Sequence, residues 1–94
     1  MNFENYDLHD ATLKSITFDW AAATCNFLIH PVGRNPAELI FEGVSKLNIP
    51  HVQPWGPSRS INSANQSEPG KYEIEMQSGD TITISAKGFG LSEL

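Results

Sequence analysis

The sequence holds a single cysteine, Cys25, so no disulfide can form within the chain. Cys25 alternates with Phe27 and Ile29, and no charged residue lies next to it, which favours a small buried thiol over a reactive one. No apolar run approaches the ~20 residues that span a bilayer. The acidic N-terminal segment also lacks the apolar stretch of a signal peptide. We therefore expect a cytoplasmic protein without membrane association.

Positive charge is scarce as well, with 6 Lys and Arg against 11 Asp and Glu and a formal net charge of -5 at pH 7. Proteins that bind nucleic acid present basic patches to the phosphates, so this balance argues against a nucleic-acid partner. It favours encounter with a basic partner. A chain of 94 residues is expected to form one domain, residues 1–94. Its modest core leaves no room for a large internal cavity.

Apolar side chains recur with a period of two, which indicates half-buried strands. The pattern covers residues 11–20, 24–30, 37–49, 72–77 and 81–86, with a further short strand at 60–63. The phase slips at Gly43, which predicts a bulge in the strand at 37–49. The tripeptide Ser78-Gly79-Asp80 is expected to turn the chain between the last two strands. We therefore expect an all-β fold: a small antiparallel sandwich or open barrel of about six strands.

The remaining segments are interpreted as connections. Residues 62–71 are polar and contain Gly and Pro, which predicts a flexible loop. The Gly-rich residues 88–94 are expected to form an edge strand or a disordered tail. A short helical turn at residues 6–11, with Asp7 as its N-cap, is compatible with the sequence.

The tract at residues 51–60 is the main functional candidate. Proline fixes φ and removes a backbone donor, so this tract is a stiff connection that is neither helix nor central strand. The prolines in and beside it are Pro50, Pro54 and Pro57. A stiff loop that carries Trp55 and Arg59 loses little freedom on binding, which makes it an economical recognition surface.

Two interpretations of this tract stay open. In the first, Trp55 is an exposed anchor for a partner. In the second, the loop folds over one open end of the sheet and buries the ring as a plug. The two interpretations are compatible if the ring packs while the neighbouring residues face outward, namely Gly56, Ser58 and Arg59.

The dipeptide His9-Asp10 invites a metal site, since such pairs supply ligands in some phosphohydrolases. A metal needs three or four converging ligands, and the other histidines, His30 and His51, lie on separate segments without ligand spacing. We expect instead that Asp10 caps backbone amides where the chain enters its first strand, with His9 half-exposed beside it. No metal or cofactor is expected.

The carboxylates of Glu73 and Glu75 occupy alternate positions on the solvent face of one strand. Glycoside hydrolysis needs two carboxylates that face each other across a substrate, so this pair is interpreted as a solvated, edge-protecting face. No serine lies in a nucleophile-elbow pattern. The sequence therefore predicts no catalytic residues and no enzymatic activity.

Short motifs along the chain resemble those of a group of small bacterial domains. These motifs are a His-Asp-Ala element before a strand that ends at Asp-Trp, a Phe-x-Gly-Val strand, a Trp-Gly loop and a closing Ile-x-x-x-Ser-Gly-Asp hairpin. In this chain they fall at residues 9–11, 19–20, 41–44, 55–56 and 74–80. Some such domains resemble immunity proteins of bacterial polymorphic toxin systems, which are small, acidic and non-enzymatic and which bind and block a cognate toxin. The resemblance implies a toxin-binding protein and carries no catalytic residue with it.

Three functions remain as expectations. The first is a cytosolic protein-binding module of the immunity type, anchored by Trp55 and Arg59. Its acidic residues would meet a basic toxin domain: Glu38, Glu42, Glu73, Glu75 and Asp80. The second is a structural homodimer that assembles through an edge strand or the Trp loop. The third is a small-ligand or metal-dependent domain around a polar set, His9, Asp10 and His51.

Overall fold

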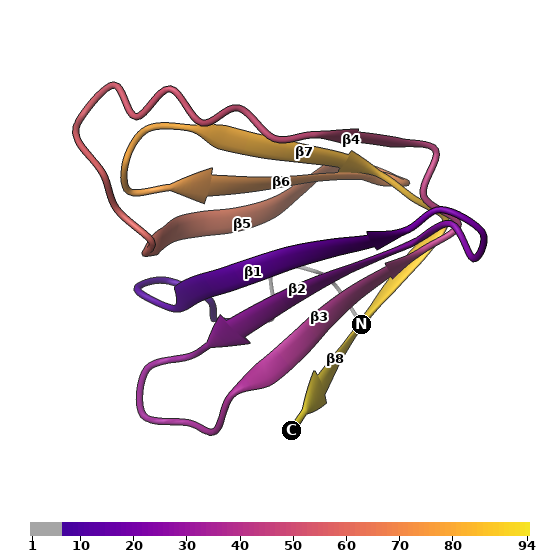
Figure 1. The fold of residues 1–94 in the computed structure, drawn as a ribbon, viewed down its shortest axis with the longest axis horizontal. Helices are drawn as coiled ribbons and strands as arrows, with labels where there is room; N and C mark the ends of the chain where they lie inside the picture. Colours follow the sequence, from indigo (N-terminus) through magenta and orange to yellow (C-terminus); the bar gives the residue numbers. More distant parts are fainter. Residues whose placement is uncertain (1–6) are drawn as a thin grey trace.

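The computed structural model describes residues 7–94, which form eight antiparallel strands (Figure 1). They are β1 (Thr12–Asp19), β2 (Thr24–His30), β3 (Ala37–Glu42), β4 (Lys46–Asn48), β5 (Ile61–Glu68), β6 (Lys71–Met76), β7 (Thr81–Ser85) and β8 (Gly88–Glu93). No helix that could cross a membrane is found among the described residues. The predicted all-β fold is confirmed, with eight strands in place of about six.

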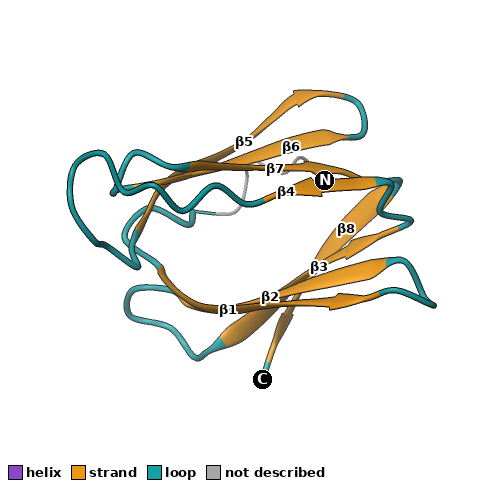
Figure 2. Ribbon diagram, turned by 45° about the horizontal axis from the view of Figure 1, so that its top comes forward, coloured by secondary structure: helices purple, strands orange, loops and turns teal. Residues whose placement is uncertain are grey.

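The strands form two layers, which Figure 2 shows as facing sheets. One sheet has the order β1-β2-β3-β8 and the other the order β4-β7-β6-β5. The predicted hairpins β1–β2 and β6–β7 are present as antiparallel neighbours. The architecture is therefore the sandwich that the alternating pattern indicates.

The core lies between the sheets and is built by the inward-facing residues of each strand. A row of aromatic rings crosses it: the ring centroids of Phe27 and Phe41 lie 5.5 Å apart, those of Phe41 and Tyr72 5.1 Å, and those of Tyr72 and Phe89 5.3 Å. Tyr72 belongs to one sheet and the three phenylalanines to the other. Aromatic contacts therefore join the two layers at the centre of the fold.

The predicted flexible loop at residues 62–71 is wrong, because most of this segment is strand β5. Its backbone pairs with β6, for example Asn65 with Glu73 and Gln66 with Tyr72. β5 is an outer strand with two register shifts, so most of its side chains stay outside the core and polar residues are tolerated there. The expected short strand at 60–63 is the beginning of this longer one.

The C-terminal residues 88–94 form the edge strand that was one of the two alternatives, and the disordered tail is wrong. β8 pairs with β3 over six positions, from Gly88 opposite Glu42 to Glu93 opposite Ala37. Phe89 and Leu91 pack against the core from this strand. Their alternation is the strand signal, although the glycines between them weaken it.

The strand expected at 37–49 is divided between the two sheets. β3 ends at Glu42, and β4 begins at Lys46 in the other sheet. Gly43 has φ +62, a conformation that favours glycine, so the phase slip marks a corner between sheets and not a bulge within one strand.

The helical turn at residues 6–11 is wrong for its described part, where His9 and Asp10 form a turn without a helix. Tyr6 lies outside the described residues. Asp10 has φ 66, in the left-handed region, which ends any right-handed helical path at this point.

Backbone hydrogen bonds join the two sheets where β1 begins. Thr12 forms an isolated bridge with Ser60, and the amide of Leu13 donates to the carbonyl oxygen of Arg59 at 2.7 Å. The amide of Ile61 donates to the carbonyl oxygen of Ala11 at 2.8 Å. These bonds fix the end of the loop at residues 49–60 against the first sheet.

Replacement of the fully buried Leu39 by alanine tests this core. We expect Leu39→Ala to lower the free energy of unfolding by about 2–5 kcal/mol, because the lost transfer energy and the new cavity add. The matched control Leu94→Ala changes a side chain that is 64% exposed and should cost no more than roughly 0.5 kcal/mol. Urea unfolding measures both, and an equal loss in the two variants would contradict the described core.

Candidate functional site

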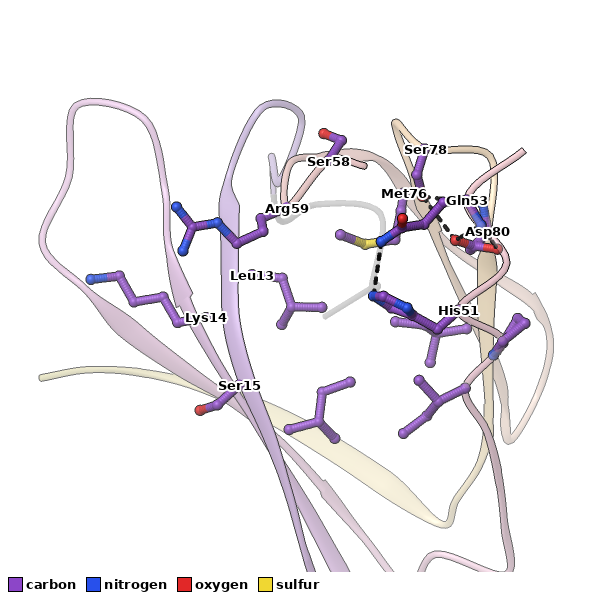
Figure 3. Close-up of a pocket in the computed structure, with 14 residues that line it drawn as sticks. Leu13, Lys14, Ser15, His51, Gln53, Ser58, Arg59, Met76, Ser78 and Asp80 are labelled. Carbon is purple, nitrogen blue, oxygen red and sulfur yellow. Dashed lines mark hydrogen bonds between the residues drawn. The ribbon is translucent and has the colours of Figure 1, made fainter. Parts of the chain in front are cut away.

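The loop at residues 49–60 is held to the β6–β7 turn by one carboxylate, that of Asp80 (Figure 3). Its oxygens accept hydrogen bonds from the amide of Val52 at 2.9 Å, from the amide of Gln53 at 2.9 and 3.1 Å, and from the hydroxyl of Ser78 at 3.0 Å. Asp80 is only 7% exposed. The charge is therefore buried, and the donors around it satisfy it.

Burial alone would raise the pKa of the Asp80 carboxyl. The hydrogen bonds from Val52, Gln53 and Ser78, together with the nearby His51, outweigh burial and hold that pKa below its ordinary value. The group therefore stays ionised at neutral pH, and the ionised form is the one that binds the loop amides.

Trp55 is fixed by its backbone and by the glycine beneath its ring. Its amide donates to the carbonyl oxygen of Ser78 at 3.0 Å, and its ring lies against Gly79, where a Cβ would clash with the ring atoms Cε3 and Cζ3. Gly79 also has φ +98, which favours glycine. Trp55 is nevertheless 77% exposed, so the buried-plug interpretation is wrong, and its role as an anchor for a partner stays a prediction.

Beside Trp55 lies a shallow surface depression of about 550 Å³, called the Trp55 hollow below. Its other lining residues are His9, Asn62, Glu75, Met76 and Gln77. One carboxylate, that of Glu75, lines it, and a second, that of Asp10, is bonded to the lining residue Gln77. The Glu75 carboxylate accepts from the side-chain amide of Asn62, and that of Asp10 accepts from the side-chain amide of Gln77. The hollow thus joins an exposed aromatic ring to oriented negative charge.

The expected role of Asp10 as a backbone cap is wrong. Its carboxylate accepts from the Gln77 side chain, and the local backbone is satisfied by the Asp10 amide, which donates to the carbonyl oxygen of Ile61 at 2.8 Å. His9 is exposed, and its Nδ1 donates to the carbonyl oxygen of Asn62 at 2.7 Å. This bond, and the Asp10 carboxylate 3.6 Å from Nε2, raise the pKa of His9 above its ordinary value.

The structure divides the predicted partner-binding residues between the two sides of the loop. Trp55 and Glu75 meet at the Trp55 hollow, whereas Ser58 and Arg59 line a different cavity, between the loop and β1. Glu73 precedes Glu75 on β6, and its carboxylate accepts from the side-chain amide of Asn65 at 3.4 Å, outside the hollow.

Gly56 and Ser58 form hydrogen bonds within the loop itself. Gly56 has φ +98 and donates its amide to the carbonyl oxygen of Gln53 at 3.1 Å, which closes a turn directly after Trp55. The hydroxyl oxygen of Ser58 accepts from the amide of Ser60 at 3.2 Å. Both residues shape the loop beside Trp55.

Asp80 was expected among the acidic residues that face a basic partner. This expectation is wrong, because the Asp80 carboxylate is buried and accepts hydrogen bonds from the loop amides of Val52 and Gln53. Glu38 and Glu42 belong to β3, in the other sheet from Glu75. Asn62 and Gln77 were not among the predicted site residues, yet their side-chain amides orient the carboxylates of Glu75 and Asp10. The sequence does contain a signal for the role of Asp80. The proline-rich loop cannot pair as a strand, so amides such as those of Val52 and Gln53 need an acceptor from elsewhere in the chain.

The polar set of His9, Asp10 and His51 does not converge. His9 lines the Trp55 hollow, and His51 lines the cavity on the other side of the loop, where its Nε2 accepts from the side-chain amide of Gln53 at 3.1 Å. Among residues 7–94 no group of three His, Cys, Asp or Glu side chains is placed to hold a metal ion.

Cys25 is fully buried in the core, as expected of a small hydrophobic residue. Burial raises the pKa of its thiol to about 11, so the thiolate that nucleophilic chemistry requires is scarce at neutral pH.

Comparisons with protein-family models, curated proteins and solved structures give no match to this chain. The resemblance to immunity proteins therefore rests on the short sequence motifs and stays a prediction.

The bonds from the amides of Val52 and Gln53 to the Asp80 carboxylate are called the clamp, and removal of that carboxylate tests whether they hold the loop. We expect Asp80→Ala to lower Tm by roughly 5–10 °C, because two loop amides lose their acceptor, and to speed hydrogen exchange at Val52 and Gln53. In the wild type, the contribution of Asp80 is fully present above the ordinary aspartate pKa and is lost as pH falls through the lowered folded value. Exchange at these two amides that is unchanged in the variant would contradict the clamp.

NMR titration of His9 tests the polar end of the hollow. We expect a pKa above the ordinary value of 6.5, which falls towards that value in Asp10→Asn because one of its causes is removed. A His9 pKa at or below 6.5 in the wild type would show that the bond to Asn62 does not persist in solution.

Proposed function

We propose that this chain is a non-enzymatic protein-binding module and that its binding surface is the Trp55 ring with the Trp55 hollow. The observation that carries the proposal is that Trp55 is 77% exposed while its amide is bonded to Ser78 and the preceding loop residues, Val52 and Gln53, are bonded to Asp80. Tryptophan is enriched among the residues that dominate interface energies. A ring on a fixed backbone loses little conformational entropy on binding, so most of its contact energy contributes to affinity.

The partner we infer is a basic segment of another protein. The face of an indole attracts cations, and the Glu75 carboxylate lines the same hollow, oriented by the side-chain amide of Asn62. The Asp10 carboxylate is bonded to Gln77, which also lines the hollow. A lysine or arginine side chain placed over Trp55 would find both kinds of attraction together. The net charge of -5 supports the same choice, since it accelerates encounter with a positive surface.

The finer proposal is that the module is a cytoplasmic immunity protein whose partner is a basic toxin domain. Its support is the set of motifs that resemble such proteins, three of which contain residues of the site: His9-Asp10-Ala11, Trp55-Gly56 and the hairpin that ends at Asp80. Arg59, expected as a second anchor, is replaced in this proposal by Glu75 and Asp10, because Arg59 lies on the other side of the loop.

A tagged pull-down from the native host tests this function, read by mass spectrometry at low and at moderate salt. We expect the wild type to recover one partner protein, with affinity that falls as salt rises. Trp55→Ala should weaken binding by about 30-fold or more, the loss typical of an interface hot spot. Glu75→Gln should weaken binding less and reduce its salt dependence.

Trp20→Ala is the matched control, because Trp20 is also exposed, at 88%, but lies next to the end of β1 near β4. It should bind as the wild type does. If the partner binds Trp55→Ala as tightly as it binds the wild type, the proposal is wrong. Recovery of this chain alone, with a dimer in sedimentation, would replace it with the homodimer alternative.

A further inference from the structure

The outer edge of β1 is open over most of its length. β1 is an outer strand of its sheet (Figure 1), and the loop at 49–60 covers only its beginning, through Thr12 and Leu13. Within the described part of the chain, no backbone bond from another strand or loop reaches this edge at residues 15–19. Such an edge presents unpaired N–H and C=O groups to any strand that lies beside it.

The ladder with β2 determines which groups face the open edge. Hydrogen-bonded and non-hydrogen-bonded pairs alternate along an antiparallel ladder. Leu13 belongs to the second kind, because its amide bonds to the loop, and the register then skips the extra residue Lys14. The count of pairs directs the N–H and C=O of Ile16 and Phe18 to the open edge and those of Thr17 to β2. An added strand therefore bonds β1 at Ile16 and Phe18.

The inner face of this edge is apolar and partly uncovered. Ile16 packs against the core, whereas Phe18 and Trp20 stay 37% and 88% exposed, with ring centroids 6.1 Å apart. Both rings line a depression with Leu47 of the other sheet, so they lie on the same side of β1 as the core. A strand placed beside β1 would remove this apolar area from water.

The outer face of the same edge carries one charge of each sign. Figure 3 shows the Lys14 side chain on the side of β1 away from Leu13, and Asp19 alternates with Phe18 onto that outer side. At ~3.3 Å per residue the two charged residues lie roughly 16 Å apart along the strand, too far to pair within one copy. Among residues 7–94 no ion pair involves either of them.

A second copy of β1, running antiparallel, is complementary to this edge. Full overlap of residues 15–19 in the two copies puts Thr17 opposite the second copy's Thr17, and Ile16 opposite its Phe18. Apolar side chains then meet on the inner face and polar ones on the outer face. A slip by one residue would place apolar side chains opposite polar ones.

The same register brings the opposite charges together. Lys14 lies diagonally across from the second copy's Asp19, a separation that a long side chain spans. The two-fold axis at Thr17 creates this ion pair twice, because the interface is isologous. The charges that cannot pair within one copy therefore pair between copies.

The antiparallel arrangement also gives Trp20 a binding place. A cavity of about 400 Å³ lies at the start of β1, between β1, the loop and β7, with apolar lining residues that include Leu13, Ile49 and Ile82. Ile49 is 45% exposed, so this apolar wall is open to water. Because the end of one β1 meets the start of the other, each Trp20 ring lies at the mouth of the second copy's cavity.

We propose that two copies of this chain form a homodimer by antiparallel pairing of their β1 edges, with two Lys14–Asp19 ion pairs on the outer face and each Trp20 in the other copy's cavity. This interface goes beyond the proposed partner binding, because the Trp55 hollow lies on the other side of the loop and stays open in the dimer.

Sedimentation of the purified chain over a series of concentrations measures the dimer. We expect Trp20→Ala to weaken it about tenfold or more, because an aromatic anchor is lost. Trp55→Ala is the matched control and should leave the dimer unchanged. A wild type that is still monomeric at roughly 1 mM would overturn the proposal. So would a dimer that Trp55→Ala abolishes and Trp20→Ala does not, since that dimer uses the loop.

An exchange of charges tests the register. Lys14→Glu sets like charges side by side and should weaken the dimer about fivefold, whereas Lys14→Glu with Asp19→Lys restores both pairs and should recover most of the wild-type affinity. Circular dichroism verifies the fold of the double variant, since Asp19 also accepts from the amide of Ala22 at 3.1 Å. A folded double variant that dimerises as weakly as Lys14→Glu shows that the proposed pairing is wrong.

Cross-linking tests the two-fold position itself. Residues directly opposite in a non-hydrogen-bonded pair have Cα atoms roughly 4.5 Å apart, which a disulfide can bridge. Mild oxidation of Thr17→Cys should therefore give a covalent dimer. Ser63→Cys, at an exposed position on the outer strand β5, is the matched control and should not cross-link. The buried Cys25 is common to both variants. Equal cross-linking of the two variants would contradict the dimer.

Discussion

The buried carboxylate of Asp80 is the interaction on which both sides of the loop depend. The loop at 49–60 pairs with β1 only at its end, through Arg59 and Ser60, and its prolines remove backbone donors, so few backbone bonds hold the rest of it. Asp80 accepts from two consecutive loop amides and from Ser78 at the β6–β7 turn. Without this acceptor those amides would need water. The same turn carries Gly79, on which the exposed ring of Trp55 rests.

Much of the fold can be predicted from local patterns in the sequence. The alternating segments become β1, β2, β6 and β7, because a period of two puts one face of each strand in the core. β5 could not be predicted, because its pairing with β6 and not its composition makes it a strand. Polar side chains are tolerated at a sheet edge once the neighbouring strand satisfies the backbone hydrogen bonds. The corner at Gly43 was seen only as a phase slip, since the sheet that each strand joins depends on contacts distant in sequence.

The candidate site was predictable in part. The proline-rich tract and its tryptophan stood out by composition, but the exposure of Trp55 depends on a glycine and a carboxylate that come more than twenty residues later. The same long-range contacts separate Arg59 from Glu75, which sequence alone placed in one binding set.

Trp55 is exposed and yet held by its surroundings, and time-resolved fluorescence anisotropy measures how far its ring moves. In Trp20→Phe, Trp55 is the only indole in the chain. We expect the anisotropy to decay almost entirely with the tumbling of the whole domain, because the ring moves with Gly79 and the bonded loop backbone. A dominant faster decay, on the picosecond to nanosecond scale of free side-chain motion, would contradict it.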